Sequence, residues 1–301
     1  MQKFHFPKSI LLIGGCGYIG TFLYEQMSRL DLHPTVCDLL VRGNPLGIPV
    51  VEADYASLSV ETLSGFDAVV WFAGHSSVQQ ALKDPQGALA NNCLNLFGLA
   101  QKLKPGTKFI YASSGSLYSA PVGKSLSPAG EADLAQIPYQ NAYDISKFAF
   151  DYLAENFLSN FYALRMGTLS GFSPNLRKEL LFNAMNISAV TSGQVFVKNR
   201  NAYRTILFLD DLWMLVKALL GSDVPPGVYN AGSISGAIGE FAEQIASVWD
   251  AEVIDQGTSD TYSFLLDTSL MDKTIGAQTA RPPMAETCRT FINQCRNFAA
   301  I

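Results

Sequence analysis

Short apolar runs alternate with amphipathic runs through the first half of the chain. The apolar runs have the length and composition of buried strands, and the runs between them repeat at helical spacing. Strands are expected at residues 10–13, 35–38, 49–54, 66–74, 108–112 and 161–166. Strands and helices that alternate in this way predict a parallel sheet covered by helices on both faces.

The pattern becomes less regular after residue 171. Before that point, residues 119–138 are rich in Pro, Gly and Ser and are expected to form a loop or lid. Helices are expected at 18–30, 58–63, 85–103, 139–158, 176–189, 211–220, 237–249 and 284–298, and further strands at 195–197, 206–209 and 228–230. A mixed tail after a regular first half predicts a second, smaller domain.

The composition excludes several classes of function. The 301 residues carry a net charge of −5 and no cluster of Lys and Arg, so no nucleic-acid partner is expected. No apolar run is long enough to span a membrane and no signal peptide is visible, so a cytoplasmic protein is expected, with no membrane partner. Five cysteines without C-x-x-C spacing and three scattered histidines predict neither a disulfide framework nor a metal site.

Glycines follow the first apolar run immediately and precede the first amphipathic run. Gly14, Gly17 and Gly20 are three residues apart, and Gly15 with the last two gives the spacing G-x-G-x-x-G. In a dinucleotide-binding fingerprint, such glycines make a tight turn, let the backbone approach a pyrophosphate and let the helix pack on the strand. The helix N-terminus offers N–H groups to the phosphates. The alternative is an ordinary glycine-rich turn before a helix.

An acidic residue in the expected place supports the fingerprint. Asp38 ends the second strand about 20 residues after the glycines, where a carboxylate can accept the ribose hydroxyls of NAD and repel the extra phosphate of NADP. Arg42 lies close enough to weaken this discrimination. The sequence therefore predicts NAD as the cofactor.

The expected fold class is α/β, a doubly wound parallel sheet of the Rossmann type with a smaller mixed α/β C-terminal substrate domain. The NAD-binding domain is expected at 1–166, with a return of the chain near 204–231, and the substrate-binding domain at 167–203 and 232–301. Ligands of such sheets bind at the carboxyl ends of the strands.

Tyr143 and Lys147 are four residues apart in an expected helix, so their side chains lie on one face. A free phenol is a poor base at neutral pH because its pKa is about 10, and a nearby ammonium stabilises the phenolate. Ser114, at the end of the fifth strand, can hydrogen-bond the same substrate oxygen. The alternative for this common spacing is an exposed amphipathic pair.

These motifs resemble the extended short-chain dehydrogenase/reductases, in particular the NAD-dependent epimerase/dehydratase family, whose members act largely on nucleotide sugars. The glycine loop is similar to the family's G-x-x-G-x-x-G, residues 113–118 to its S-S-x-x-V-Y, and residues 143–147 to its Y-x-x-S-K. The resemblance implies catalytic roles for Ser114, Tyr143 and Lys147.

The resemblance also implies binding residues. The implied cofactor contacts are Gly14, Gly17, Tyr18, Ile19, Gly20, Asp38, Asp54, Ala73, Gly74, Asn92 and Lys147. The implied substrate contacts are Ser116, Thr168 and Arg204, with Arg204 gripping a diphosphate, whereas Arg177 and His75 are expected at the surface and in a solvated loop. The helices near 89–103 and 148–157 resemble those that pair members of the family as homodimers.

Departures from the family pattern narrow the expected reaction. Gly115 and Ser116 stand where dehydratases of the family carry acidic residues, and Thr168 stands where an asparagine is usual. The remaining Ser, Tyr and Lys suffice for hydride and proton transfer, so epimerisation of a nucleotide sugar through a transient ketone is expected. The alternatives are a reductase or dehydrogenase, with NAD or NADP, of a non-sugar alcohol or ketone, and a non-catalytic NAD-binding regulatory protein.

Overall fold

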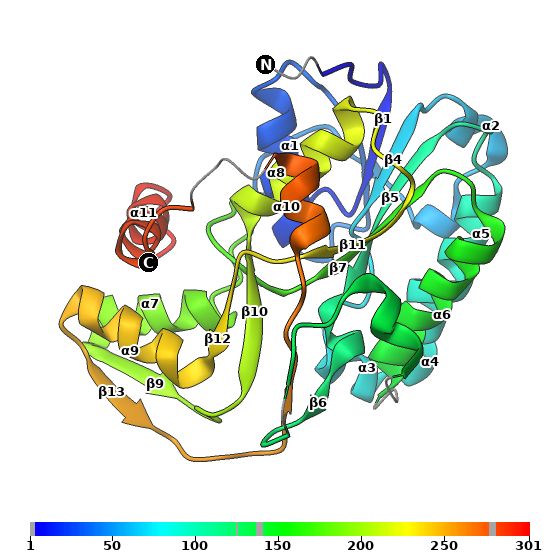
Figure 1. The fold of residues 1–301 in the computed structure, drawn as a ribbon. Helices are drawn as coiled ribbons and strands as arrows, with labels where there is room; N and C mark the ends of the chain where they lie inside the picture. Colours follow the sequence, from blue (N-terminus) through cyan, green and yellow to red (C-terminus); the bar gives the residue numbers. More distant parts are fainter. Residues whose placement is uncertain (1–3, 125, 137–140, 277–280) are drawn as a thin grey trace.

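A computed structural model describes residues 4–124, 126–136, 141–276 and 281–301. Seven parallel strands form its large sheet (Figure 1). In spatial order they are β11 (Gly227–Ala231), β7 (Phe161–Met166), β5 (Lys108–Ser114), β4 (Ala68–Trp71), β1 (Ile10–Ile13), β2 (Thr35–Asp38) and β3 (Val51–Glu52). The order runs outward from β1 in both directions, so the sheet has a topological switch point beside β1. The predicted doubly wound sheet is confirmed.

One face of the sheet is covered by α1 (Tyr18–Ser28), α8 (Leu209–Gly221) and α10 (Ser269–Ile275) (Figure 1). Their apolar side chains and those of the strands form one core cluster, which includes Leu12, Leu23 and Leu215, all fully buried. Burial of strand side chains on this face explains why the strands read as continuous apolar runs.

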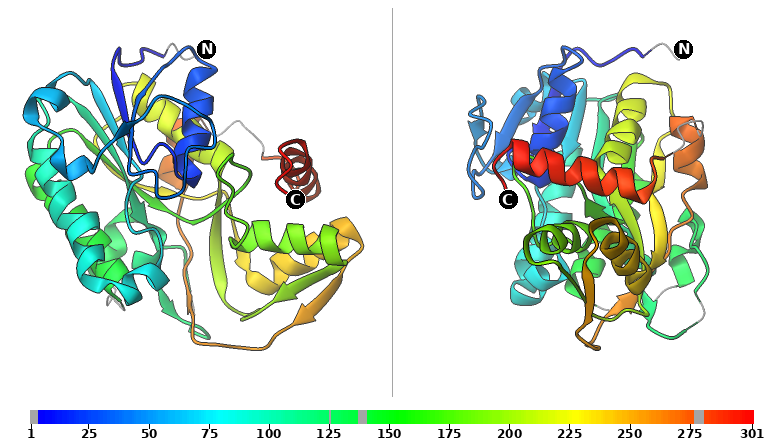
Figure 2. Two further views of the ribbon diagram at one scale, coloured as in Figure 1. Left: turned by 180° about the vertical axis from the view of Figure 1, so that it is seen from behind. Right: turned by 90° about the vertical axis from the view of Figure 1, so that its left-hand side faces the viewer.

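The opposite face is covered by the helices that follow β3, β4 and β5 (Figure 2). They are α2 (Val60–Ser64), α5 (Asn95–Gln101) and α6 (Ala142–Phe157), whereas α3 (Val78–Lys83) and α4 (Pro85–Leu89) pack against α6. A π turn at Ala90–Leu94 joins α4 to α5, so the expected helix over 85–103 has a wider turn at its centre. Asn141 caps α6, and residues 139–140 of the expected helix lie outside the described residues.

A smaller region packs beside the carboxyl ends of the large sheet. Its helices α7 (Leu181–Ser192), α9 (Ile238–Trp249) and α11 (Met284–Asn297) share a separate core cluster (Figure 2). Its strands pair as β12 (Ile234–Ala237), β10 (Tyr203–Phe208) and β8 (Thr168–Ser170), as β13 (Glu252–Asp255) with β9 (Gln194–Val197), and as β14 (Tyr262–Ser263) with β6 (Ala120–Pro121).

Several predicted boundaries are wrong. The third strand has two residues instead of six, because Asp54 leaves it to cap a 3₁₀ turn at Tyr55–Ser57. The expected loop at 119–138 contains β6 and a 3₁₀ helix at Glu131–Gln136, and residues 125, 137 and 138 of that loop are not described. Two short helices and four short strands were not predicted from the sequence, namely α3, α10, β8, β12, β13 and β14. The four strands pair with segments far away in the sequence.

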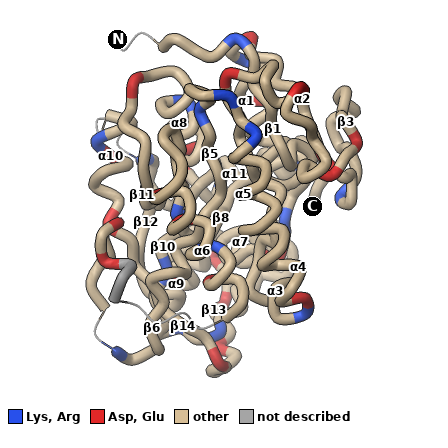
Figure 3. Tube along the Cα trace, turned by 90° about the vertical axis from the view of Figure 1, so that its right-hand side faces the viewer, with Lys and Arg blue, Asp and Glu red and all other residues tan. Residues whose placement is uncertain are grey.

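Charged side chains of both signs are dispersed over the molecule (Figure 3). Within the described ranges, no cluster of three or more His, Cys, Asp or Glu residues is arranged to hold a metal ion. None of the helices found in those ranges has the length and apolar character needed to cross a membrane.

Candidate active site

The glycine loop brings the end of β1 against the end of β4. Gly14 has a φ of +82°, and a Cβ there would lie 2.7 Å from the carbonyl carbon of Phe72. No side chain among the described residues caps α1, and its first turn carries no acidic residue. The N–H groups at this helix end therefore face the cavity beside Gly17 and Ile19 without a side-chain partner, which fits the pyrophosphate of a dinucleotide.

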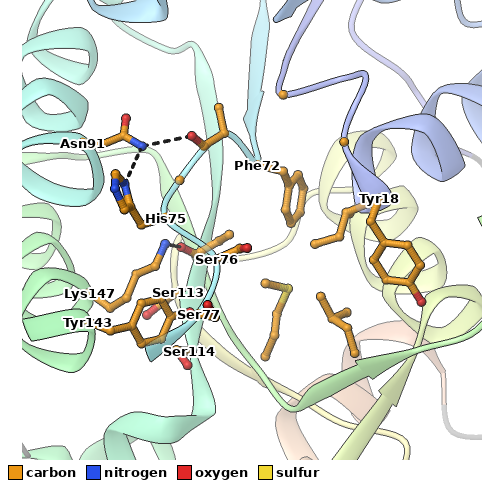
Figure 4. A pocket seen from close by; sticks show the side chains of 18 of the residues that line it. Tyr18, Phe72, His75, Ser76, Ser77, Asn91, Ser113, Ser114, Tyr143 and Lys147 are labelled. Atoms are coloured by element: carbon orange, nitrogen blue, oxygen red, sulfur yellow. Dashed lines mark hydrogen bonds between the residues drawn. The ribbon is translucent and has the colours of Figure 1, made fainter. Parts of the chain in front are cut away.

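A cavity of about 810 Å³ opens beside this loop, at the carboxyl ends of the parallel strands (Figure 4). Most of the residues predicted from the sequence line it. They are Gly14, Gly17, Tyr18, Ile19, Asp38, Asp54, Ala73, Gly74, Ser114, Ser116, Tyr143, Lys147 and Thr168. We call the part formed by Gly14, Gly17, Tyr18 and Ile19 the glycine wall.

The carboxylate of Asp38 is held in place by the backbone. Its oxygens accept hydrogen bonds from the backbone N–H groups of Cys16 (3.0 Å) and Leu40 (2.8 Å). Asp54 accepts a bond from the N–H of Ala56 (2.9 Å) and caps the following 3₁₀ turn. Both carboxylates line the cavity, together with Arg42.

Two predicted cofactor residues lie behind the cavity wall. Gly20 packs its backbone against the carbonyl oxygen of Gly14, where a Cβ would collide. Asn92 is fully buried and donates to the backbone oxygen of His75 (3.2 Å) and to the hydroxyl of Ser146 (3.0 Å). Asn92 therefore supports the segment after β4, whereas the neighbouring Asn91 lines the cavity.

Lys147 and Tyr143 point from α6 into the cavity beside Ser114 (Figure 4). Lys147 is 4% exposed, and its Nζ donates to the carbonyl oxygen of Ala112 (2.7 Å) and lies 4.9 Å from the centre of the Trp71 ring. Burial lowers the pKa of Lys147 to about 7, because the charged ammonium loses its hydration.

Tyr143 is also buried, and its burial raises the pKa of the phenol, while a hydrogen bond with Ser114 opposes the rise. The phenol is therefore neutral at pH 7 in the protein alone. A base made from this phenol needs a nearby positive charge, which a protonated Lys147 supplies.

Sequence reasoning missed a carboxylate at this site. Asp144 is 2% exposed, and the hydroxyl of Ser116 donates to its Oδ1 (2.5 Å). The Ser116 Oγ in turn lies 2.8 Å from the Oγ of Ser114. Burial raises the pKa of Asp144, and hydrogen bonds from Ser116 and Asn141 oppose the rise. The one sequence signal for this carboxylate was the position of Asp144 directly after Tyr143 in the predicted helix.

Arg204 was expected to contact the substrate and Arg177 to lie at the surface, and the structure places them the other way round. Arg177 lines the cavity, and its Nη1 donates to the hydroxyl of Ser76 (3.4 Å). Arg204 is absent from the described cavity lining. Its guanidinium donates to the backbone oxygen of Tyr262 and to the Thr261 hydroxyl (3.0 Å), and lies 4.7 Å from the centre of the Tyr262 ring.

A second part of the cavity is formed by segments far apart in the sequence. Tyr262 and Phe264 come from the strand β14 and the residue after it, and the sequence analysis gave them no role. They lie in the lining with Thr168 and Arg177. We call these four residues the aromatic wall.

Hydrogen bonds connect the glycine loop to residues 171–175, which lead from β8 to α7. The Tyr18 hydroxyl donates to the backbone oxygen of Gly171 (2.7 Å), and the Ser173 hydroxyl donates to that of Tyr18 (2.6 Å). Asn175 donates to the backbone oxygen of Cys16 (2.7 Å). The entry to the smaller region is therefore fixed on the glycine wall.

The parallel sheet, the glycine loop at its switch point and the cavity define a dinucleotide-binding protein of the Rossmann class. Residues 10–232 match the family described as the NAD dependent epimerase/dehydratase family. The chain therefore belongs to this family of enzymes, whose cofactor is NAD, and the predictions of the family, of an enzyme and of NAD are confirmed.

Curated relatives are similar to this chain over part of their length. The UDP-glucose 4-epimerase of Corynebacterium glutamicum is 26% identical over 160 residues, which cover 50% of this chain and 47% of the relative. That of Lacticaseibacillus casei is 28% identical over 181 residues, which cover 56% and 53%. The chain thus matches about half the length of these relatives.

Solved structures are similar over nearly the whole chain. An NAD dependent NDP-hexosamine 5,6-dehydratase involved in tunicamycin biosynthesis has a TM-score of 0.80 at 22% identity, covering 96% of this chain and 98% of its own. The UDP-glucose 4-epimerase of Thermotoga maritima, solved with UDP-glucose, has a TM-score of 0.79 at 18% identity, covering 97% and 99%. At these identities the likeness shows the shared fold.

Proposed function

We propose that this chain is an NAD-dependent epimerase that acts on a nucleotide sugar through a transient keto intermediate. The observation that carries the proposal is the meeting of Ser114, Tyr143 and Lys147 at the cavity into which the glycine wall faces. The glycine wall would hold NAD there, and the cofactor would supply a reversible hydride acceptor for the carbon that bears the hydroxyl group. The UDP-glucose 4-epimerases that match this chain over about half of their length support this choice of reaction.

Tyr143 removes the hydroxyl proton, and Ser114 hydrogen-bonds the reacting oxygen. The ammonium of Lys147 stands one turn from Tyr143 on α6, with Nζ 5.9 Å from the centre of the phenol ring. With a pKa of about 7, Lys147 gains and loses a proton near neutrality, and its charged form stabilises the phenolate. Its bond to Ala112 holds it at the end of β5.

The substrate occupies the aromatic wall in this proposal. Ser116 and Thr168 remain the proposed substrate contacts, and Arg177 replaces Arg204 as the group that binds a diphosphate, because Arg177 lies on the cavity. A guanidinium can donate two parallel N–H bonds to a phosphate. Arg204 acts on substrate binding through Tyr262, which it holds.

The remaining expectations are proposals of the same kind. Residues 1–166, with a return near 204–231, bind the cofactor, and residues 167–203 and 232–301 bind the substrate. A homodimer is supported by the apolar side chains that the π turn and α6 expose, namely Leu94, Ile145, Tyr152 and Phe157. The expectation of a cytoplasmic location rests on the sequence.

The test is incubation of the NAD-loaded protein with UDP-glucose and related nucleotide sugars, with chromatography of the product and the near-ultraviolet absorbance of reduced cofactor as readouts. An epimeric product without net reduction is expected. Tyr143→Phe should reduce turnover by on the order of 100-fold or more. The matched control is Tyr152→Phe, an exposed tyrosine on the same helix, which should turn over normally. A Tyr143→Phe enzyme with full turnover would reject the assignment.

A second candidate is a reductase or dehydrogenase of a non-sugar alcohol or ketone. It is favoured by the position of Arg204, which is outside the described cavity lining and donates to the backbone oxygen of Tyr262 and the hydroxyl of Thr261. Stoichiometric accumulation of reduced cofactor with a simple alcohol would establish it. Cofactor binding with no product from any substrate would favour a non-catalytic NAD-binding protein.

A further inference from the structure

A buried carboxylate lies one turn beyond Lys147 on α6, and the mechanism above gives it no role. Asp151 is four residues after Lys147, so both side chains lie on the same face of the helix. Asp151 is 1% exposed and Lys147 is 4% exposed, and α6 packs here against β5. A carboxylate at this depth needs hydrogen-bond partners from the protein, because water does not reach it.

Two partners of Asp151 are side chains of β5. The Tyr111 hydroxyl donates to its Oδ1 (3.0 Å), and the Ser113 hydroxyl donates to its Oδ2 (2.9 Å). Tyr111 and Ser113 flank Ala112, whose carbonyl oxygen accepts the bond from the Lys147 Nζ (2.7 Å). Asp151 therefore fixes the stretch of β5 that holds the Lys147 ammonium.

A further partner of Asp151 is a buried arginine. Arg165 on β7 is 1% exposed, and its Nε donates to the Asp151 Oδ2 (2.8 Å). Arg165 lies in register with Ser113 of the neighbouring strand, so the guanidinium, the hydroxyl and the carboxylate meet between the sheet and α6. One buried carboxylate is therefore accompanied by two buried cations, Arg165 and Lys147.

The charge of Asp151 acts on Lys147 over one helical turn. Burial lowers the pKa of Lys147 to about 7, and the charge of Asp151 opposes this fall. Among the described residues, no carboxylate forms a direct ion pair with Lys147. Asp144, three residues before Lys147, is bound by Ser116 and Asn141 instead.

Other titratable groups face this pair of side chains. They are Tyr143 and Glu155 on α6, Tyr111 on β5, Tyr118 in the 3₁₀ turn after β5 and Arg165 on β7. Burial raises the pKa of all three phenols, so they are neutral at pH 7. The Glu155 side chain is 48% exposed, so water screens its charge. Asp151 therefore supplies a buried negative charge that faces Lys147.

The ion pair of Asp151 has an alternative role that is purely structural. It joins α6 to β7, and the bonds from β5 satisfy the oxygens of its carboxylate. This role predicts a loss of stability when Asp151 is changed and no effect on the protonation of Lys147. The experiment must therefore measure protonation as well as stability.

We propose that Asp151 is a positioning residue that keeps Lys147 charged and in place at the active site. Through Tyr111 and Ser113 it fixes the β5 carbonyl to which the ammonium donates, and its charge favours the ammonium over the neutral amine. The inference rests on the proposed function, in which charged Lys147 stabilises the phenolate of Tyr143. Loss of the charge should move the pH range of activity, whereas loss of the strand bonds should lower turnover at every pH.

The first experiment removes the charge of Asp151 together with that of its partner. Asp151→Asn combined with Arg165→Met leaves neither partner buried as an unpaired charge, so the variant should fold. In the NAD-loaded protein with UDP-glucose, kcat should fall as the pH rises through the pKa of Lys147, because the ammonium is lost. Without the negative charge this fall should begin about one pH unit lower, so kcat at pH 8 should be about tenfold below the parent value.

The matched control is Glu155→Gln, which removes a half-exposed carboxylate one turn further along α6. It should keep the pH profile of the parent protein. The same shift in Glu155→Gln and in the variant of Asp151 would overturn the assignment to Asp151.

The second experiment keeps the carboxylate and removes its bonds to the strand. Tyr111→Phe combined with Ser113→Ala leaves the ion pair with Arg165 intact. This variant should lower kcat by on the order of tenfold at every pH with little change in KM, because Lys147 is less well placed. An unchanged kcat would overturn the role of Asp151 in fixing β5.

The third readout does not depend on turnover. In protein labelled with ¹³C at the lysine ε-carbon, the Lys147 resonance is identified by its loss in Lys147→Met, and its titration gives the pKa. This pKa should be about 7 in the parent protein and about one unit lower after Asp151→Asn with Arg165→Met. An unchanged pKa with only a lower melting temperature would overturn the proposal. A shifted pKa without turnover of any nucleotide sugar would support the role of Asp151 and reject the proposed function.

Discussion

The glycine wall and the aromatic wall are built in different ways. The glycine wall comes from one short segment, and its conformation is set by backbone geometry, such as the positive φ of Gly14. The aromatic wall combines Thr168, Arg177 and Tyr262, which are separated by up to 94 residues, and its shape depends on side-chain contacts such as those of Arg204. The first wall can therefore be shared by a family, while the second can change with a few substitutions.

The largest expected effect is on the glycine wall. Gly14→Ala places a Cβ against the backbone of Phe72 at a positive φ, so the variant should lose about 2–4 kcal/mol of unfolding free energy and its NAD affinity. Urea unfolding and calorimetry measure both. Gly98→Ala in α5 is the control, because its Cβ meets no atom within 4 Å, and it should be neutral or slightly stabilising. Equal stability of the two variants would contradict the argument.

The next effect separates the two walls. Arg204→Ala removes the bonds that hold Tyr262 and Thr261, so the KM for UDP-glucose should rise by about 10-fold or more, which corresponds to about 1.4 kcal/mol or more. The affinity for NAD should stay unchanged, because the hydrogen bonds described for Arg204 go to Tyr203, Thr261 and Tyr262 and not to the glycine wall. The control is Arg200→Ala, which breaks exposed ion pairs with Glu243 and Asp255. A parallel loss of NAD affinity would show that the walls are not independent.

Lys147 lines the same cavity as the two walls, and its burial predicts a pH dependence of stability. Its pKa is about 7 in the folded protein and about 10.4 when unfolded, so the unfolded chain binds more protons between these values. The unfolding free energy of NAD-free protein should therefore rise with pH from about 7 to about 10, by up to about 1.4 kcal/mol per pH unit from this residue.

Urea unfolding of Lys147→Met at several pH values measures this contribution. The variant should show a smaller rise over that range, whereas Lys83→Met on the surface of α3 should behave like the parent protein. An unchanged slope in Lys147→Met would mean that the residue is equally charged in the folded and unfolded states.

The smallest expected effect concerns the choice of cofactor. Asp38→Ala removes the carboxylate at the end of β2, so the ratio of NAD to NADP affinity should fall by about tenfold, or about 1.4 kcal/mol. Glu52→Ala on the neighbouring strand is the control, because Glu52 pairs in register with Asp38 and is exposed. Titration of each variant with NAD and with NADP measures this ratio of affinities. An unchanged ratio would assign the preference to other residues, such as Arg42.

Much of the fold could be predicted from the sequence because its signals are local. The runs at 10–13, 35–38 and 161–166 coincide with β1, β2 and β7, since buried parallel strands need continuous apolar residues. The strands β8 and β12 could not be predicted, because segments of three or four residues are too short to show a periodic pattern. Both strands also pair with β10, which is far away in the sequence.

The candidate site divides in the same way. Ser114, Tyr143 and Lys147 belong to short motifs, and the structure brings them to one cavity. Asp144 and Arg177 could not be assigned, because their contacts depend on which elements pack together. Positions 115 and 116 carry no acidic residue, but α6 places the carboxylate of Asp144 within hydrogen-bond distance of Ser116.

The bonds from Tyr18, Ser173 and Asn175 have a thermodynamic consequence. They join the glycine loop, which faces the proposed NAD site, to residues 171–175, which follow Thr168 of the aromatic wall. Binding of NAD and binding of the proposed substrate therefore share one set of contacts. A coupling free energy is reciprocal, and if one ligand strengthens these contacts, each ligand must tighten the other by the same factor. The product would then leave most slowly from the form that also holds its cofactor most tightly.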